Sequence, residues 1–215
     1  MQAPSFESAP MQRIAIVGVT GRVGSRLARE LLARGHRVTG IARNTADVPP
    51  QAGLRLQSAD ASRSESLAPV LAGHDVVVSA ARFDGGPSAQ VVVDAVRAAG
   101  VPRLLVVGGA GSLEVAPGVA LIDTPEFPEA YRAEAAAGRA FLQALRDVAD
   151  LDWTFVSPAA VFEPGERTGV FRVGGDSLPV DAQGRSAISM EDYAIAFADE
   201  IERPAHPRQR ISVGY

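Results

Sequence analysis

The sequence predicts an α/β fold with one doubly wound, mainly parallel sheet and helices on both of its faces. Three observations predict this class. Strand-like and helix-like segments alternate along most of the 215 residues, with short connections between them. The segment Asp75–Ser79 is apolar on both faces, as a buried parallel strand should be. A glycine-rich turn joins the first strand directly to the first helix, an arrangement typical of nucleotide-binding sheets.

The glycine-rich turn lies between a predicted strand, Arg13–Gly18, and a predicted helix, Val23–Arg34. Gly18 permits the tight turn, Gly21 lets backbone N–H groups approach a pyrophosphate, and Gly24 lets the helix pack closely on the sheet. The helix N-terminus adds free N–H groups and a positive dipole end. We interpret the turn as a Rossmann-type dinucleotide motif whose cofactor-binding residues are Gly18, Thr20, Gly21, Arg22, Val23 and Gly24. A purely structural glycine turn is the alternative.

The elements that follow keep the alternation, and apolar residues at strand or helix spacing predict each one. We expect further strands at Arg37–Ala42, Leu54–Ser58, Asp75–Ser79, Arg103–Val107 and Asp152–Ser157. We expect further helices at Ser62–Leu71, Pro87–Ala99 and Ala130–Val148. Pro87 is tolerated because it falls in the first turn of its helix, where its missing N–H is not needed.

The alternation breaks after the sixth strand. Residues 161–189 are rich in glycine and contain short strand-like pieces such as Val170–Val173. The Ser-Met-Glu-Asp run that begins at Ser189 is a capping-box start for a helix that extends to about Glu202. Arg210–Val213 is expected to form a last edge strand. The sequence shows neither an internal repeat nor a second domain.

Composition limits the classes of function. The chain is 47% hydrophobic and 21% charged, which is ordinary for a globular protein. Its net charge of −4 gives no electrostatic reason to expect nucleic acid or an anionic membrane as a partner. The lack of cysteine excludes disulfides, thiol catalysis and thiolate metal sites. The three histidines are far apart without metal-ligand spacing, so we expect no metal site, and we expect His36 at the surface.

Length and the terminal segments limit the organisation. We expect one domain over residues 11–215, preceded by a disordered lead over residues 1–10, which carry two prolines and small polar side chains. The lead has neither the basic region nor the apolar region of a secretory signal. No apolar run approaches the ~20 residues needed to span a bilayer. We therefore expect a cytoplasmic protein.

The end of the second predicted strand distinguishes NAD from NADP. A carboxylate about 20 residues past the glycine motif would bind the adenosine ribose hydroxyls, whereas an arginine can pair with a 2′-phosphate. The chain has Arg43 at this strand end, and Asp47 comes later, in an expected loop. Arg43 is therefore the candidate 2′-phosphate ligand, assisted by Arg22, and NADP is the expected cofactor, with NAD as the alternative. The alternative is that both arginines are solvated surface residues without a ligand.

Three further strand ends are expected to line the same crevice. A carboxylate follows the third strand, where it can accept a hydrogen bond from an adenine amino group. Small side chains end the fourth strand and leave room for a ribose. A glycine-rich turn ends the fifth strand beside the expected nicotinamide, and Ser112 at its close is a candidate catalytic residue. The candidate cofactor-binding residues at these ends are Asp60, Ala61, Ser79, Ala80, Gly108 and Gly109. Each end could instead be only a tight turn.

From residue 11 onward the chain resembles the atypical short-chain dehydrogenase/reductases with an NmrA-like NAD(P)-binding domain. It is similar above all to a small bacterial branch whose members carry names such as NADH-flavin reductase and NAD-dependent epimerase, and more distantly to biliverdin-IXβ/flavin reductases. The resemblance rests on Gly18-x-Thr20-Gly21-x-x-Gly24, Ala59-Asp60, Val106–Ser112, Leu151–Ala159, Gly165–Gly169 and Ile188–Ala194. It implies that Ser157 and Pro158 bind the cofactor near the nicotinamide. It also implies a substrate pocket formed by about residues 108–128 and 157–189.

One departure from the wider superfamily bears on the chemistry. Many of its members use a Tyr-x-x-x-Lys pair, in which the lysine keeps the tyrosine acidic enough to exchange a proton with a carbonyl. Here Tyr131 is present, but Ala135 occupies the lysine position. Tyr131 is therefore either a candidate catalytic acid or a surface aromatic residue. The mechanism of an alcohol dehydrogenase or a sugar epimerase is disfavoured, whereas hydride transfer to a flavin needs no strong protein acid.

Two functions from different classes follow. The first is an NAD(P)H-dependent reductase that passes hydride from NADPH to a flavin, a quinone or a similar small-molecule acceptor. The second is an NADP-binding sensor or regulatory protein, in which the nucleotide shifts a partner-binding surface without turnover. The missing lysine is compatible with both, and an epimerase-like activity is least favoured. The sequence carries no signal for an oligomeric state.

Overall fold

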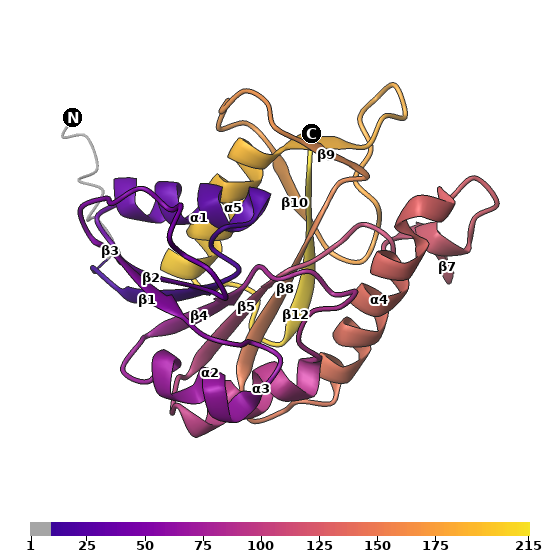
Figure 1. The fold of residues 1–215 in the computed structure, drawn as a ribbon. Coiled ribbons are helices and arrows are strands. Elements are labelled where there is room, and N and C mark those ends of the chain that lie inside the picture. The colour runs from indigo at the N-terminus through magenta and orange to yellow at the C-terminus, as the bar shows by residue number, and fades with distance from the viewer. Residues whose placement is uncertain (1–9) are drawn as a thin grey trace.

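The computed structural model describes residues 10–215, so the expected disordered lead lies, apart from Pro10, outside the described residues. An eight-stranded sheet forms the centre of this part of the chain (Figure 1). Its strands are β1 (Arg13–Val17), β2 (Arg37–Ala42), β3 (Leu54–Ser58), β4 (Val76–Ser79), β5 (Arg103–Val107), β8 (Asp152–Pro158), β10 (Arg172–Gly174) and β12 (Gln209–Gly214). They lie in the order β3-β2-β1-β4-β5-β8-β12-β10, and neighbours are parallel except for β12 and β10. The predicted fold class is confirmed.

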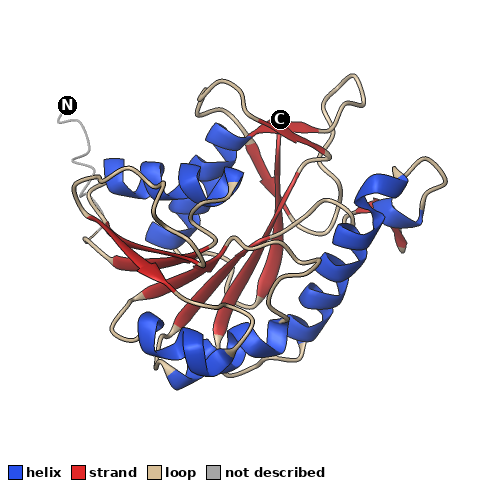
Figure 2. Cartoon of the chain, viewed as in Figure 1, coloured by secondary structure: helices blue, strands red, loops and turns tan. Residues whose placement is uncertain are grey.

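Helices cover both faces of the sheet (Figure 2). They are α1 (Arg22–Ala33), α2 (Ser64–Leu71), α3 (Ala89–Ala98), α4 (Arg132–Arg146) and α5 (Met190–Glu202). Helices α1 and α5 pack against each other on one face, and α2, α3 and α4 lie on the opposite face (Figure 1). Within the described residues, no helix is long and apolar enough to cross a membrane.

Two hydrophobic cores lie between the sheet and its two helical layers, one on each face. In β1, Ile14 and Ile16 belong to the core under α1 and α5, whereas Ala15 and Val17 belong to the core under the other helices. Successive side chains of a strand point to opposite faces, so a strand that is apolar throughout fits between two helical layers. The uninterrupted apolar runs of the sequence therefore require the layered fold that the structure shows.

The carboxyl-terminal third departs from the predicted elements. β12 lies between β8 and β10, so the predicted position of Arg210–Val213 at the sheet edge is wrong. β12 is buried over most of its length, and the exposed β10 forms the edge instead. Two small sheets are also present that the sequence does not predict. They pair β6 (Glu114–Ala116) with β7 (Val119–Ala120), and β9 (Val161–Glu163) with β11 (Ala187–Ser189). Strands of two or three residues are too short to show a period in the sequence.

Helix α5 begins at the predicted capping residue, but its first turn has other partners. The Ser189 hydroxyl accepts a hydrogen bond from the Asp192 amide at 3.0 Å, as an N-cap should. In a complete capping box the acidic side chain would accept from the Ser189 amide. That amide instead donates to the Tyr215 hydroxyl at 3.1 Å, and the Asp192 carboxylate is bound to residues 168 and 169. The first turn of α5 thus holds a loop that precedes it in the sequence.

We expect Gly24→Ala to destabilise the fold. A Cβ at Gly24 would lie 2.2 Å from the Gly18 carbonyl oxygen, and a backbone atom cannot turn aside. Overpacking of this kind should lower the free energy of unfolding by about 1–3 kcal/mol. Gly175→Ala is the matched control, since a Cβ there meets nothing within 4 Å; it should stay within about 0.5 kcal/mol of the parent. Urea unfolding measures both, and equal midpoints for the two variants would contradict the prediction.

Candidate functional site

The carboxyl ends of the parallel strands meet at one edge of the sheet, where the glycine-rich turn lies. β1 has β2 on one side and β4 on the other, and the chain winds away from it in both directions. A crevice is expected beyond the end of such a strand. The other predicted residues that the topology places along this edge are Arg43, Asp60, Ala61, Ser79, Ala80, Gly108, Gly109 and Pro158.

The turn after β1 presents unpaired backbone amides. Gly18 has a φ of +88°, and a Cβ there would lie 2.7 Å from the Ala80 carbonyl oxygen, so this position requires glycine. Gly21 donates its amide to the Gly18 carbonyl at 3.0 Å and is the N-cap of α1, without a capping side chain. The amides of residues 22–24 consequently have no acceptor among the residues described. With Thr20 exposed beside them, they form a helix N-terminus that can bind an anion.

Arg43 and Asp60 follow the ends of two neighbouring strands, β2 and β3. Asp60 accepts hydrogen bonds from the hydroxyl and the amide of Ser62, at 2.7 and 3.0 Å. These bonds, helped by the positive charges of Arg63 and Arg43, hold the pKa of the Asp60 carboxyl below its ordinary value. Arg43 itself is exposed and forms no ion pair with any described residue. The structure therefore offers the guanidinium of Arg43, which is free of ion pairs with the described residues, and one ionised carboxylate here, next to the half-buried Ala61.

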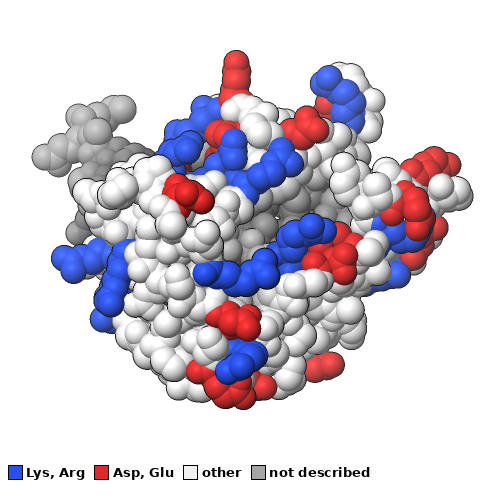
Figure 3. Space-filling model, in the orientation of Figure 1, with Lys and Arg blue, Asp and Glu red and all other residues white. Residues whose placement is uncertain are grey.

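A cleft of about 630 Å³ opens at the ends of β5 and β8, with Arg22 of α1 in its lining. The space-filling view shows a hollow near the centre of this face, bordered by basic side chains (Figure 3). A Cβ at Gly109 would meet nothing within 4 Å, so the backbone there faces open space. Gly108 is different, because a Cβ would lie 2.4 Å from the Phe155 ring. Backbone and Pro158 together give the cleft a floor without large side chains.

Two predicted cofactor residues lie below the surface of this cleft. Ser79 is 3% exposed and Ser157 is fully buried, and neither lines the cleft. The Ser157 hydroxyl has no hydrogen-bond partner within the described part of the chain. Ala80, next to Ser79, is half-buried under the Gly18 turn. The two serine side chains are therefore not accessible to a ligand in the cleft.

The two candidate catalytic residues differ in their surroundings. The Ser112 hydroxyl accepts a hydrogen bond from the buried Arg210 at 3.2 Å, so a guanidinium orients it, and none of the residues that the structure describes accepts its proton. Tyr131 is 65% exposed at the rim of the cleft, and its hydroxyl bonds to none of the described residues. Ala135, four residues after Tyr131, packs against Gly111. All 21 basic residues of the chain are arginine, so no Tyr–Lys pair can form.

One wall of the cleft comes from α4 and the loop before it; the loop belongs to the predicted substrate segment, but the contribution of α4 side chains is not predicted by the sequence. Glu134 accepts a hydrogen bond from the Phe83 amide at 2.9 Å and so ties the loop after β4 to α4. Arg132 donates to the Phe127 carbonyl at 3.3 Å, and its guanidinium lies 5.5 Å from the centre of the Phe127 ring. The first contact joins residues 51 positions apart, and no local pattern announces it.

The predicted substrate segments overlap the lining in part. Residues 108–112, 121–128 and 158–163 contribute to the cleft, together with side chains of α4. Residues 113–120, although expected to shape the pocket, do not line it, and neither do residues 164–189. For residues 164–189 the reason is the direction of the chain, which leaves the cleft after β9 and runs toward α1 and α5, where ion pairs and hydrogen bonds hold it.

Comparison with known proteins gives one family over most of the chain. The family described as NAD(P)H-binding matches residues 18–204. A structure from Burkholderia pseudomallei, provisionally named an exported protein, is 50% identical, with a TM-score of 0.87 over 95% of this chain and 100% of that one. A provisionally named epimerase from Bacteroides thetaiotaomicron is 40% identical, with a TM-score of 0.90 over 96% and 98%. A provisionally named NADH-flavin reductase from Streptococcus pneumoniae is 33% identical, with a TM-score of 0.83 over 94% and 99%.

We expect Arg43→Glu to weaken NADPH binding more than NADH binding. The free guanidinium suits a 2′-phosphate, whereas a carboxylate would repel that phosphate and accept from bare ribose hydroxyls. The ratio of the two dissociation constants should shift by about tenfold or more, equivalent to about 1.4 kcal/mol. Calorimetry with both nucleotides measures it, and Arg29→Glu, an exposed position further along α1, should leave the ratio unchanged. Equal affinity of the parent protein for NADPH and NADH would sink the prediction.

Proposed function

The chain belongs to the NAD(P)H-binding family, and we propose that it is an NADPH-dependent reductase that passes hydride to a flavin, a quinone or a similar conjugated small molecule. The position of the cleft carries the proposal. It opens at the ends of β5 and β8, with the first residue of α1 in its lining. A dinucleotide whose pyrophosphate lies on the free amides of α1 would reach the floor of this cleft with its other half.

The residues along the sheet edge fit NADPH. The amides of residues 22–24 suit a pyrophosphate, Arg43 suits a 2′-phosphate, and Asp60 can accept from an adenine amino group. Bound NADPH supplies the hydride. The open backbone at Gly109 lets a nicotinamide ring lie close to the floor, because no side chain stands in its way. The missing side chain of Gly24 lets α1 start close to the turn after β1, which places its free amides at the same sheet edge as the cleft.

The protein's part in the reaction is to bind and orient two rings. Phe127 and Phe162 contribute apolar surface to the cleft, where a flat acceptor can displace water. The acceptor gains a hydride and a proton, and the nucleotide is oxidised. A flavin or quinone can take that proton from water, since its developing negative charge is spread over a conjugated system. Tyr131 at the exposed rim therefore does not have to be a strong acid.

The charges at the acceptor end of the cleft favour an uncharged acceptor. Glu126 and Glu163 line it, are exposed, and form no ion pair with any residue that the structure describes. Arg139 is neutralised by Asp123, with both carboxylate oxygens within 2.9 Å of the same guanidinium nitrogen. Arg22 lies at the cofactor turn and would face phosphate there. The free charges left for an acceptor are negative and would repel an acceptor phosphate.

A sensor or regulatory role is the second candidate. The observation that favours it is the lack of a proton-transfer pair, since Ser112 is held by Arg210 and the chain has no lysine. A sensor would bind NADPH without consuming it in the presence of any acceptor. Epimerisation of a sugar requires proton transfer at an alcohol, and the same lack of a pair argues against it.

We propose the cytoplasm as the site of action, because a reductase consumes NADPH and needs a pool in which the nucleotide is reduced again. The name of the Burkholderia relative points to export of that protein. Fractionation of cells that produce the full chain from its own start, with a cytoplasmic enzyme as marker, distinguishes the two locations.

We expect Tyr131→Phe to lower kcat/KM for a flavin or quinone by less than about tenfold, because the proton can come from water. The variant removes one hydroxyl and keeps the ring that lines the rim. The rate is followed as the loss of NADPH absorbance. A loss near the 10²–10⁴-fold typical of a general acid would contradict the mechanism and indicate carbonyl reduction. Tight NADPH binding without turnover of flavins, quinones and carbonyls would favour the sensor.

We expect riboflavin to be reduced with a higher kcat/KM than FMN, its phosphorylated counterpart. Glu126→Gln/Glu163→Gln should narrow the difference by removing the negative charges, and added salt should narrow it in the parent as well. Glu65→Gln, an exposed carboxylate on α2, is the control and should leave the ratio unchanged. A parent protein that prefers FMN at low salt would show that these carboxylates do not select the acceptor.

A further inference from the structure

The segment of residues 164–170, which we call the strap, connects β9, whose residues line the cleft, to β10. Polar contacts hold it in place. Every residue of the strap is exposed, so apolar burial cannot hold it. It is held by polar contacts with α5 and α1. The Gly165 amide donates to Glu191 at 2.8 Å, and the Gly169 amide donates to Asp192, also at 2.8 Å. Arg167 binds Glu30 of α1 through two nitrogens, at 2.9 and 3.1 Å.

The carboxylates that hold the strap are ionised at neutral pH. Burial alone would raise the pKa of Glu191, but the bonds from the Gly165 amide and from Arg26 outweigh it and leave the pKa below its ordinary value. The pKa of Asp192 is also lowered, because bonds from Thr168 and Gly169 outweigh its burial. Both side chains belong to the first turn of α5, where negative charge is favourable.

Glu191 also contacts the helix that would bind the nucleotide. One carboxylate oxygen accepts from Arg26 of α1 at 2.6 Å, while the other accepts from Gly165. Arg26 in turn donates to the carbonyl of Arg22 at 2.8 Å. Arg22 begins α1, carries one of the unpaired amides, and lines the cleft. Direct contacts thus run from the anion-binding turn to the strap, and Glu163 of the cleft wall lies two residues before the strap's anchored amide.

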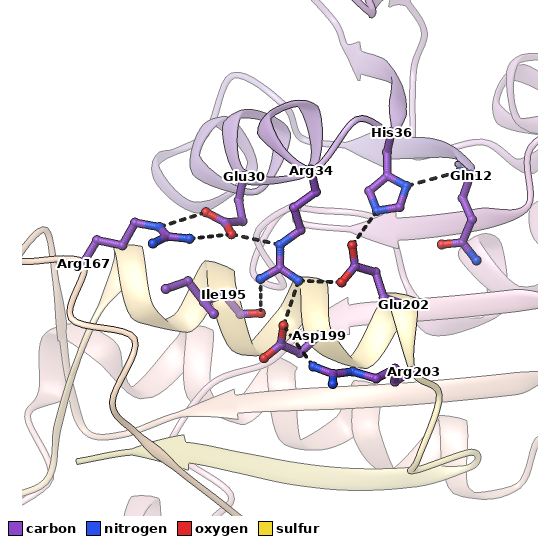
Figure 4. Close-up of polar contacts among 9 residues, drawn as sticks. All are labelled: Gln12, Glu30, Arg34, His36, Arg167, Ile195, Asp199, Glu202 and Arg203. Carbon is purple, nitrogen blue, oxygen red and sulfur yellow. Dashed lines mark hydrogen bonds and ion pairs between the residues drawn. The ribbon is translucent and has the colours of Figure 1, made fainter. Parts of the chain in front are cut away.

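A second set of contacts keeps α1 and α5 in a fixed relation (Figure 4). Glu30 binds Arg34 at 2.9 Å as well as Arg167, and Arg34 binds Glu202 of α5 at 2.7 Å. Glu202 also contacts the ring of His36 at 3.0 Å. His36 is 3% exposed, so the expectation of a surface histidine is wrong; the helix-to-strand turn folds under α5. Because this network fixes α1 relative to α5, a change at Arg26 is passed to the strap through Glu191 and is not lost in a movement of the helices.

We propose that Glu191 is a positioning residue that couples β9 (Val161–Glu163), which lines the acceptor end of the cleft, to nucleotide bound at the start of α1. Bound nucleotide would restrict the movement of β9 and the strap through this residue. An anion on the turn orders Arg22 and its carbonyl, Arg26 follows that carbonyl, and Glu191 passes the constraint to Gly165. Coupling of two binding events is reciprocal, so an acceptor should also tighten the nucleotide. The identity of the two ligands rests on the proposed function, whereas the link itself rests on the contacts above.

Hydrogen exchange tests the link without requiring turnover. We expect NADP⁺ to slow amide exchange in residues 163–169 of the parent by about fivefold or more, a typical size for such coupling. Glu191→Gln and Arg26→Gln should each abolish this protection, while calorimetry still detects NADP⁺ binding. Glu65→Gln, which removes a first-turn carboxylate from α2, is the matched control and should keep the protection. The two variants remove opposite partners of the Arg26–Glu191 contact, so the same loss of protection in both would not be explained by a folding defect in one of them.

Steady-state kinetics distinguish a positioning role from a merely structural one, because only the positioning role predicts a change in KM for the acceptor alone. Glu191→Gln should raise KM for the acceptor about fivefold while changing kcat and the NADPH dissociation constant by less than about twofold. NADP⁺ binding without protection of the strap in the parent would overturn this inference and leave the proposed function intact. A parent that binds no NADP⁺ at all would overturn both. Protection that survives in both variants would assign the link to Arg167 and Glu30 rather than to Glu191, and so would also overturn the proposal.

Discussion

The close approach of α1 to the turn after β1 is the constraint on which the rest of the structure depends. The space between the Gly18 carbonyl and Gly24 admits no Cβ, and Gly18 itself is in a backbone conformation that favours glycine. Because α1 starts this close to the strand, its first amides lie at the sheet edge beside the other strand ends. α5 packs on α1 and in turn holds the strap. The close contact between Gly18 and Gly24 therefore determines where the anion-binding turn lies. Through α1 it also determines where α5 and the strap lie.

The parts of the fold that local chemistry determines could be predicted from the sequence. Runs that are apolar on both faces required a buried parallel sheet, and β2, β3 and β5 begin and end where their periodicity indicates. Glycine spacing located the turn after β1. The parts that depend on distant partners could not be predicted. β12 looked like an edge strand because nothing in its own sequence specifies that β10 returns to cover it.

The site shows the same division more sharply. The strand ends at Arg43, Asp60 and Gly109 could be located from spacing, because the fold brings successive strand ends together. The wall built by α4 could not, since it depends on a contact such as that of Glu134 with the amide of Phe83. Ser157 illustrates a further limit. A residue can lie at the expected strand end and still direct its hydroxyl into the interior, because alternate residues of a strand face opposite sides.

The distribution of charge bears on how chemistry could proceed in this cleft. The chain has no lysine, and arginine stays protonated, so its 21 arginines can supply positive charge but cannot themselves take up or release a proton. The arginines near the cleft act as structural cations: Arg210 orients Ser112, Arg132 holds the loop before α4, and Arg26 joins α1 to α5. A protein built this way can orient ligands accurately but has little means of moving protons. That combination suits hydride transfer between rings that exchange protons with water, and in such a reaction the position of the walls decides the rate.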